Sequence, residues 1–117
     1  MTHAQRGAVS RRGPARHERP SIDEAALVAA RAADRLLAAA REAGEPRWIA
    51  YLEPLPDRLR DDEIGDLRRT ALRARSAYGP KDSVRDVLDA EVTEPFLEAV
   101  DRLLRELNRR DAAGDRP

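Results

Sequence analysis

The strongest constraint on this chain is a 3.6-residue hydrophobic period between residues 96 and 107. Large apolar side chains recur there at three- and four-residue intervals, as one face of an α-helix requires. They are Phe96, Leu97, Val100, Leu103, Leu104 and Leu107. No segment alternates with a period of two for long enough to predict a β-strand. The sequence therefore predicts an all-α fold, with this helix near residues 94–110 and Pro95 in its first turn.

Two more long helices are predicted before it. The first covers residues 21–43, where Ser21 and Glu24 have the spacing of a capping box and Gly44 supplies the stop. Its apolar stripe consists mainly of alanine, so a partner helix can approach closely but each contact buries little area. The second lies near residues 58–78 and ends before the Gly79-Pro80 pair. Its predicted apolar face consists of Ile64, Leu67, Ala71, Ala74 and Tyr78.

The connectors between these helices carry apolar residues and should pack against the bundle. Residues 48–52 have helical spacing between Pro46 and Pro54, which predicts one or two helical turns. Asp82 or Ser83 can cap a short turn that carries Val84, Val87 and Leu88. With 117 residues, the chain is long enough for one domain. We therefore predict a small three-helix bundle-like domain over residues 21–110, with short helical turns in the connectors.

Both ends of the chain are predicted to be disordered. Residues 1–20 contain five arginines and two histidines, with Met1 and Val9 as their only large apolar residues. Such a segment cannot bury enough surface to offset its ordering entropy. It forms a basic tail with a formal charge of +4, although the whole chain has 22 basic and 22 acidic residues. Residues 111–117 form a second, shorter disordered end.

Composition argues against an enzyme and against bound cofactors. The chain has no cysteine, and both histidines, His3 and His17, lie in the predicted tail. No phosphate-binding loop or nucleophile motif occurs. The acidic run at residues 61–63 with Asp66 could hold a divalent metal ion, but acidic charge at a helix start explains it better. We therefore expect no catalytic, cofactor-binding or metal-ligating residues.

The charged residues of the predicted helices are sorted by helix end. Acidic residues come first and arginines last in the second and third helices, which matches the helix dipole. In the second helix the alternative interpretation is a phosphate-binding arginine patch. In the third helix, three pairs at i, i+4 spacing are expected to form ion pairs along the helix. These pairs are Glu98–Arg102, Asp101–Arg105 and Glu106–Arg110.

The uncharged stretches are too short to cross a membrane, and no export signal is recognisable, so a cytoplasmic location without membrane contact is expected. Lys81 is the only lysine among 22 basic residues, and alanine is abundant. This codon bias indicates a bacterium with a GC-rich genome.

The lean core suggests a non-enzymatic interaction protein, such as an adaptor, accessory subunit or oligomerising regulator of a larger bacterial assembly. Without alanine and Met1, few large apolar residues remain, so the apolar helix faces are expected to pair with a second copy or another protein. For the two aromatic residues of residues 48–52, packing in the core is favoured over an interface role, which stays open. The predicted interface consists of Trp48, Tyr51, Phe96, Val100, Leu103 and Leu107.

The alternative hypothesis is a nucleic-acid-associated protein that binds phosphates non-specifically through the basic tail. The expected phosphate contacts are Arg6, Arg11, Arg12, Arg16 and Arg19. None of the predicted connectors is as short as the turn of a helix-turn-helix, so sequence-specific DNA reading is not expected.

Overall fold

A computed structural model describes residues 15–114 of the chain, with side chains up to Asp111, and confirms the predicted all-α domain. No β-strand occurs in this range. The α-helices are α2 (Pro20–Ala43), α3 (Pro46–Leu52), α4 (Leu55–Asp61), α5 (Ile64–Arg75) and α6 (Ala90–Gly114). Three single turns of 3₁₀-helix accompany them: η1 (Arg16–Glu18), η2 (Ser76–Tyr78) and η3 (Val84–Asp86).

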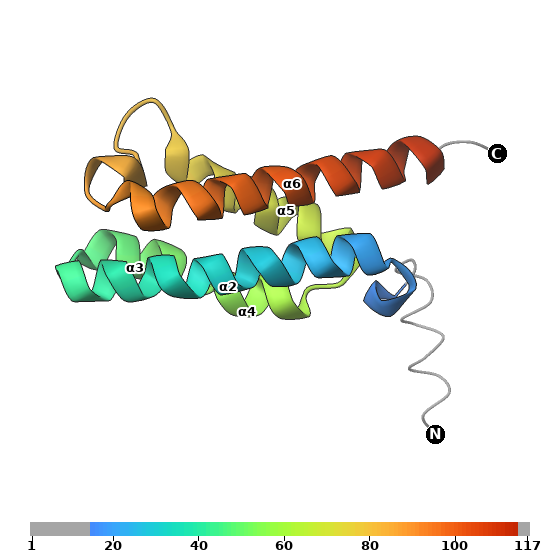
Figure 1. Cartoon of the computed structure of the whole chain (residues 1–117), viewed down its shortest axis with the longest axis horizontal. Helices are drawn as coiled ribbons and strands as arrows, with labels where there is room; N and C mark the ends of the chain where they lie inside the picture. Colours follow the sequence, from blue (N-terminus) through green and yellow to red (C-terminus); the bar gives the residue numbers. More distant parts are fainter. Residues whose placement is uncertain (1–14, 115–117) are drawn as a thin grey trace, which may run out of the picture.

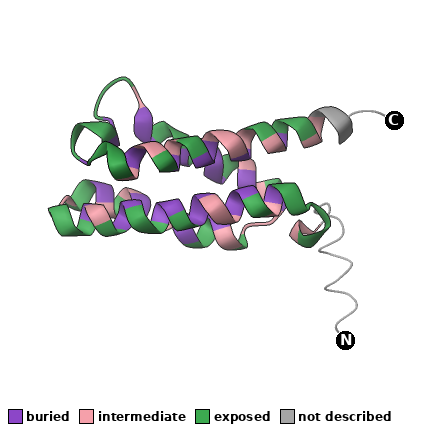
Figure 2. Cartoon of the chain, in the orientation of Figure 1, coloured by how far each residue is buried: buried purple, intermediate pink, exposed green. Residues whose placement is uncertain are grey.

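The helices form two layers. The long helices α2 and α6 run antiparallel side by side in the front layer of Figure 1, and α3, α4 and α5 lie behind them. α4 and α3 pack on α2, and α5 packs on α6. Buried residues follow the inner sides of both layers, as Figure 2 shows. The largest fully buried side chains include Phe96, Leu36, Leu52, Leu55, Leu59, Leu67, Leu103 and Leu107.

Alanine makes α2 the centre of this packing. Seven of its alanines are at most 3% exposed: Ala25, Ala26, Ala29, Ala30, Ala32, Ala33 and Ala40. Short side chains let three other helices approach α2 closely, and the larger side chains of those helices then fill the interior. The alanine stripe buries little apolar area itself, but it allows the helices of one chain to form a closed core.

The predicted start of α2 is wrong, but its predicted end is confirmed. The helix begins at Pro20, with Arg19 as the N-cap and no side-chain cap hydrogen bond. Proline suits the first helical position because its missing N–H needs no partner there. Ser21 therefore lies inside the helix, and no capping box forms. At the other end, Gly44 adopts the left-handed conformation with φ 66°, and its amide donates to the Arg41 carbonyl over 3.1 Å.

The predicted second helix is divided into α4 and α5. The chain breaks at Asp62, whose backbone is extended with ψ 140°. The Thr70 hydroxyl donates a hydrogen bond to the Asp62 carboxylate and so fixes the turn from α5. On the other side, the Arg16 guanidinium donates to the carbonyls of Leu59 (2.8 Å) and Asp62 (3.0 Å). These contacts satisfy carbonyls that the end of α4 leaves open.

The described structure extends beyond both predicted domain boundaries. It starts at Ala15 rather than residue 21, and η1 brings Arg16 onto the domain, where its Nε also donates to Asp23 over 2.8 Å. At the other end, α6 stays helical to Gly114, four residues past the predicted end. Residues 1–14 and 115–117 lie outside the described residues, so disorder in these segments remains a prediction.

α6 begins at Ala90, so Pro95 is its sixth residue rather than part of its first turn. The Asp89 carbonyl accepts the amides of Val92 and Thr93, both over 3.0 Å, and starts the helix one turn before the proline. Within a helix, proline removes one hydrogen bond to the carbonyl four residues earlier. Here that residue is Glu91, which is exposed, so water can replace the missing donor.

Both predicted connector turns are confirmed. Residues 46–52 form the short helix α3. Ser83 caps η3 by accepting the Arg85 amide over 3.1 Å, and Asp86 completes a capping box by accepting the Ser83 amide over 3.1 Å. Val84 and Leu88 are buried beside α6, as predicted, whereas Val87 is 42% exposed.

Tyr78 joins η2 to α6 within the core. Its hydroxyl donates to the Thr93 carbonyl over 2.5 Å, and its ring lies 6.5 Å from the Phe96 ring. Burial, followed by the charge of Glu94, raises the pKa of Tyr78 above its ordinary value of 10.0. Because the neutral form is favoured in the folded state, Tyr78 contributes full stability below about pH 10, which is lost as pH rises toward the raised pKa.

Replacing Tyr78 by phenylalanine is therefore expected to have two effects. At pH 7 the free energy of unfolding falls by about 1 kcal/mol, because one hydrogen bond is lost. Above pH 10 the variant loses less stability than the wild type, because the titrating group is gone. Urea unfolding at pH 7 and at pH 11 measures both effects. The Tyr51→Phe variant retains Tyr78 and should keep the wild-type alkaline loss. An equal loss in the Tyr78→Phe variant would contradict this account.

Candidate functional site

The structure places the predicted interface residues in the interior of the chain itself. Phe96, Val100 and Leu103 are fully buried, Leu107 is 1% exposed and Trp48 is 5% exposed. Only Tyr51 is half-buried. The hypothesis that these residues form an open apolar face is therefore corrected. The alanine stripe of α2 lets the front and back layers close over them. Trp48 packs in the core, as the core interpretation of residues 48–52 predicts.

The five arginines predicted to contact phosphate do not form one described patch. Arg6, Arg11 and Arg12 lie outside the described residues. The side chain of Arg16 is 11% exposed and binds Asp23 and two carbonyls, so it is not available to a ligand. Arg19 is exposed, and its guanidinium donates to the Glu18 carbonyl over 3.4 Å.

Most ion pairs of α6 run between helices rather than along α6 as predicted. None of the three predicted i, i+4 pairs forms among the described residues. Instead, Arg102 bonds Glu24 of α2 over 3.3 Å, and Asp101 accepts Arg75 of α5 over 3.0 Å. Arg68 of α5 bonds both Asn108 and Asp111 of α6. These interhelical contacts connect α6 to both layers and engage half of the arginines on α5.

Arg85 and Glu94 form a two-bond ion pair beside Tyr78. The Arg85 Nε and Nη2 atoms donate to the two carboxylate oxygens over 2.8 and 2.7 Å. The hydrogen bond from Arg85 is the main reason that the pKa of Glu94 is lowered. This pair lies at the surface and fixes η3 against α6, so it belongs to the scaffold.

Another side of α5 is exposed, and its arginines make fewer ion pairs within the chain than those that bond α6. We define the α5 face as Arg69, Leu72 and Arg73 of α5 together with Ser76, the first residue of η2, which lie three and four residues apart and are all exposed. Leu72 is 49% exposed, more than any other large apolar side chain of the described chain. The Arg69 side chain is 82% exposed, and its one ion pair, with Asp66 at 3.6 Å, is long and exposed. No ion pair forms on Arg73 among the described residues.

Aromatic rings of α3 hold two of the exposed arginines in place. The Arg73 guanidinium lies 4.6 Å from the centre of the Tyr51 ring, and the Tyr51 hydroxyl donates to the Arg73 carbonyl over 2.6 Å. Arg47 lies 4.9 Å from the Trp48 ring centre, and the two rings meet edge to face at 5.6 Å. Stacking uses the flat side of a guanidinium and leaves its N–H edge free for an anion.

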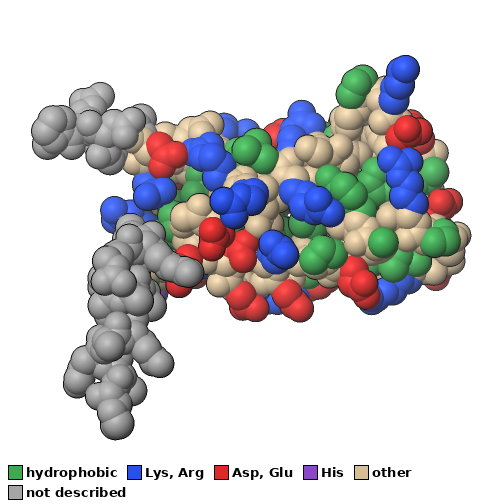
Figure 3. All heavy atoms as spheres, turned by 180° about the vertical axis from the view of Figure 1, so that it is seen from behind, with side chains coloured by type: hydrophobic (Ala, Val, Ile, Leu, Met, Phe, Trp, Pro, Cys, Tyr) green, Lys and Arg blue, Asp and Glu red, His purple; other side chains and the backbone are tan. Residues whose placement is uncertain are grey.

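Figure 3 shows the face of the molecule opposite to the view of Figure 1. Arginine side chains gather across the middle of this face, with hydrophobic side chains between them and acidic side chains along its lower edge. The helix α5 carries four arginines against one aspartate, and two of them, Arg68 and Arg75, bond residues of α6. Such a surface fits a partner that offers carboxylates around an apolar side chain, or the phosphates of a nucleic acid.

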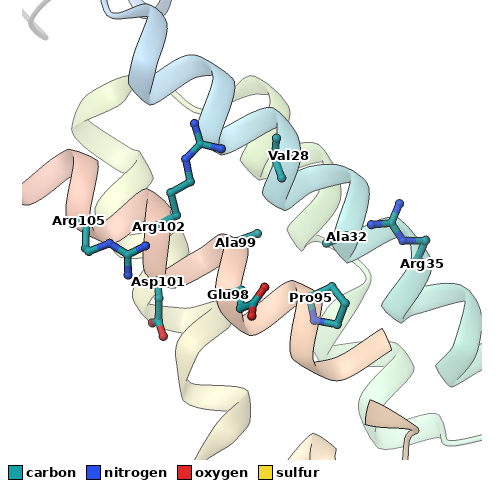
Figure 4. A pocket seen from close by; sticks show the side chains of 9 residues that line it. All are labelled: Val28, Ala32, Arg35, Pro95, Glu98, Ala99, Asp101, Arg102 and Arg105. Carbon is teal, nitrogen blue, oxygen red and sulfur yellow. The ribbon is translucent and has the colours of Figure 1, made fainter. Parts of the chain in front are cut away.

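Shallow hollows follow the seam between α2 and α6 on the front of the molecule. One of them has a volume of about 570 Å³, and Figure 4 shows its side chains. We call it the basic hollow. Small apolar residues form its floor, and Arg102 reaches from α6 toward α2 while Asp101 points away. Its lining consists of Val28, Ala32, Arg35, Pro95, Glu98, Ala99, Asp101, Arg102 and Arg105.

A second hollow of about 390 Å³ lies further along the same seam, near the end of α2 and the start of α6. We call it the acidic hollow, because three carboxylates and no basic residue line it. Val87, the other exposed large apolar residue of the described chain, lies in this hollow. The lining comprises Ala39, Glu42, Ala43, Val87, Leu88, Asp89, Glu91 and Val92.

The described residues hold no group of three or more side chains suited to a metal ion. Asp62 accepts a hydrogen bond from Thr70, and Asp66 lies beside Arg69. His17 is exposed on η1, and Lys81 is exposed in the loop before η3. Over the part of the chain that the structure describes, no helix is long and apolar enough to span a membrane.

Comparison with known proteins gives no relative: no family model, no curated protein and no solved structure matches this chain.

One exposed residue outside the predicted interface, Leu72, has a recognisable signal in the sequence. Leu72 falls outside the apolar face predicted from Ile64, Leu67 and Ala71, and a leucine off the buried face is a candidate contact residue. Val87 had no such signal, because its spacing from Val84 matched that of a buried turn.

Proposed function

We propose that this protein is a non-enzymatic helical interaction protein, an adaptor, accessory subunit or oligomerising regulator of a larger bacterial assembly. The observation that carries the proposal is the α5 face, where Leu72 is exposed between Arg69 and the stacked Arg73. Interfaces favour an apolar centre with arginine around it. The fitting partner is a protein that presents an apolar side chain flanked by carboxylates.

A preorganised arginine strengthens this proposal. Fixing a long side chain on binding costs about 0.5–1.5 kcal/mol, and Tyr51 already holds Arg73 in the free protein. The Tyr51 hydroxyl also fixes the helix that carries Arg73. A ligand carboxylate can thus meet a donor that is already oriented.

The proposal is tested by capture with two matched variants. Proteins retained from a cell extract by the wild type are compared with those retained by Leu72→Asp and Val87→Asp. Each replacement removes an exposed apolar side chain from a different face, so neither is expected to unfold the domain. A true partner of the α5 face remains with Val87→Asp and is lost with Leu72→Asp. With the purified partner, Leu72→Asp should weaken affinity about 30-fold, since a central contact contributes about 2 kcal/mol. Equal retention by both variants would contradict the proposal.

The second candidate function is non-specific binding of nucleic-acid phosphates, with the N-terminal arginines and the α5 face as contacts. The stacked guanidinium of Arg73, which has no ion-pair partner within residues 15–111, favours it. Against it, residues 15–114 contain 18 basic and 21 acidic residues, a net charge of −3. The wild type, the Leu72→Asp variant and an additional Arg73→Glu variant can be titrated with a labelled DNA duplex. Binding that weakens steeply with salt, is reduced by Arg73→Glu and is unchanged by Leu72→Asp would favour this candidate over the first.

A further inference from the structure

The seam between α2 and α6 carries opposite charges at two positions along its length. In the basic hollow, Arg35 and Arg105 have no ion-pair partner within residues 15–111. In the acidic hollow, Glu42, Asp89 and Glu91 likewise have none. Elsewhere on α2 and α6, the charges largely pair within the chain. One carboxylate, Glu98, also lines the basic hollow without an ion-pair partner, so the unpaired charges there are two arginines and one glutamate, whereas those of the acidic hollow are three carboxylates. The two hollows therefore differ in the sign of their net unpaired charge.

We propose that this seam is the interface of a twofold-symmetric dimer, in which the acidic hollow of each copy faces the basic hollow of the other. A twofold axis that passes between the two hollows exchanges them, so a single rotation satisfies both ends at once. The result is a closed interface. The proposal does not depend on the α5 face, which lies on the opposite side of the molecule and would stay free in both copies.

The shape of the seam allows this contact. Ala32 and Ala99 form a floor of small residues in the basic hollow. In the acidic hollow, Val87 is 42% exposed and gains burial only from outside the chain. Each copy can thus insert Val87 toward the small-residue floor of the other, while carboxylates meet arginines around it. Burial of such a side chain supplies the apolar part of the interface.

The charges also set the expected salt dependence. Exposed charge pairs weaken as the Debye length shrinks from about 10 Å at 0.1 M to about 3 Å at 1 M salt. The dimer should therefore dissociate more readily at high salt. Sedimentation velocity on the full-length chain at 10–100 μM measures the monomer–dimer equilibrium at each salt concentration.

Charge reversal gives the decisive experiment. The first variant, Glu42→Arg/Glu91→Arg, makes both hollows basic, and the second, Arg35→Glu/Arg105→Glu, makes both hollows acidic. Each variant alone places like charges at both ends of the twofold interface, so its dimer dissociation constant should rise at least about tenfold. When the two variants are mixed, every end again pairs opposite charges, and a one-to-one heterodimer should form.

Three controls and contrary outcomes complete the design. Circular dichroism and melting temperature must show that both variants stay folded, and the Leu72→Asp variant should dimerise like the wild type. A wild type that stays monomeric at 100 μM in low salt overturns the proposal. So does a dimer that survives both reversals, a mixture that forms no heterodimer, or an assembly that continues beyond two copies. Partner capture by the Leu72→Asp variant tests the α5 face alone, and its result does not bear on the dimer.

Discussion

Replacing Leu103 by alanine is expected to lower the free energy of unfolding by about 3 kcal/mol, within the range of about 2–5 kcal/mol for such cavities. Leu103 is fully buried, and it lies in the core where α6 packs on the other helices. The rigid neighbours cannot collapse fully into the space, so packing contacts are lost as well as apolar burial. Chemical denaturation at several protein concentrations measures the change.

The matched control is the same substitution one residue later. Leu104 is only half-buried, so Leu104→Ala should cost about 1 kcal/mol, in proportion to the smaller area that it removes from water. The pair also distinguishes core from interface. If the apolar face of α6 instead paired with another molecule, Leu103→Ala would weaken association and leave the stability of the monomer almost unchanged.

Replacing Arg16 by alanine is expected to lower the free energy of unfolding by about 2–3 kcal/mol. This is a large effect for a residue so near the start of the sequence. The variant loses charge-assisted hydrogen bonds to Leu59 and Asp62, each in the class that contributes about 1.5–3 kcal/mol. The ion pair with Asp23 adds less, because the Asp23 side chain is 35% exposed and water can solvate it. Urea unfolding followed by circular dichroism measures the loss.

Two variants show whether the geometry of Arg16 is responsible. Arg16→Lys keeps the charge but has no planar fork, so it should recover only part of the stability. Arg19→Ala removes an arginine from the same segment that is exposed and makes one weak contact, and it should change stability by less than about 0.5 kcal/mol. Equal effects of Arg16→Ala and Arg19→Ala would mean that net charge matters and the contacts with α4 do not.

Local sequence patterns are sufficient to predict the helical fold and the helix ends that depend on local chemistry. The period of residues 96–107 placed α6, Gly44 ended α2, and Ser83 capped η3. Each of these features depends on residues close together in the chain, so a single sequence shows it. The apolar face predicted for residues 64–78 is likewise confirmed, because all five of its residues are buried: Ile64, Leu67, Ala71, Ala74 and Tyr78.

Only contacts between distant parts of the chain determine which side chains are buried in the core and which stay exposed. Arg16 belongs to the domain because it meets carbonyls 43 and 46 residues later. Glu24 bonds Arg102, which joins α2 to α6. Both contacts join residues that are distant in sequence, and no local pattern reports them. The same holds for the apolar face of α6. Its hydrophobic period predicts that the face exists, but only the close approach of the alanine-rich α2 determines that other helices of the same chain cover it.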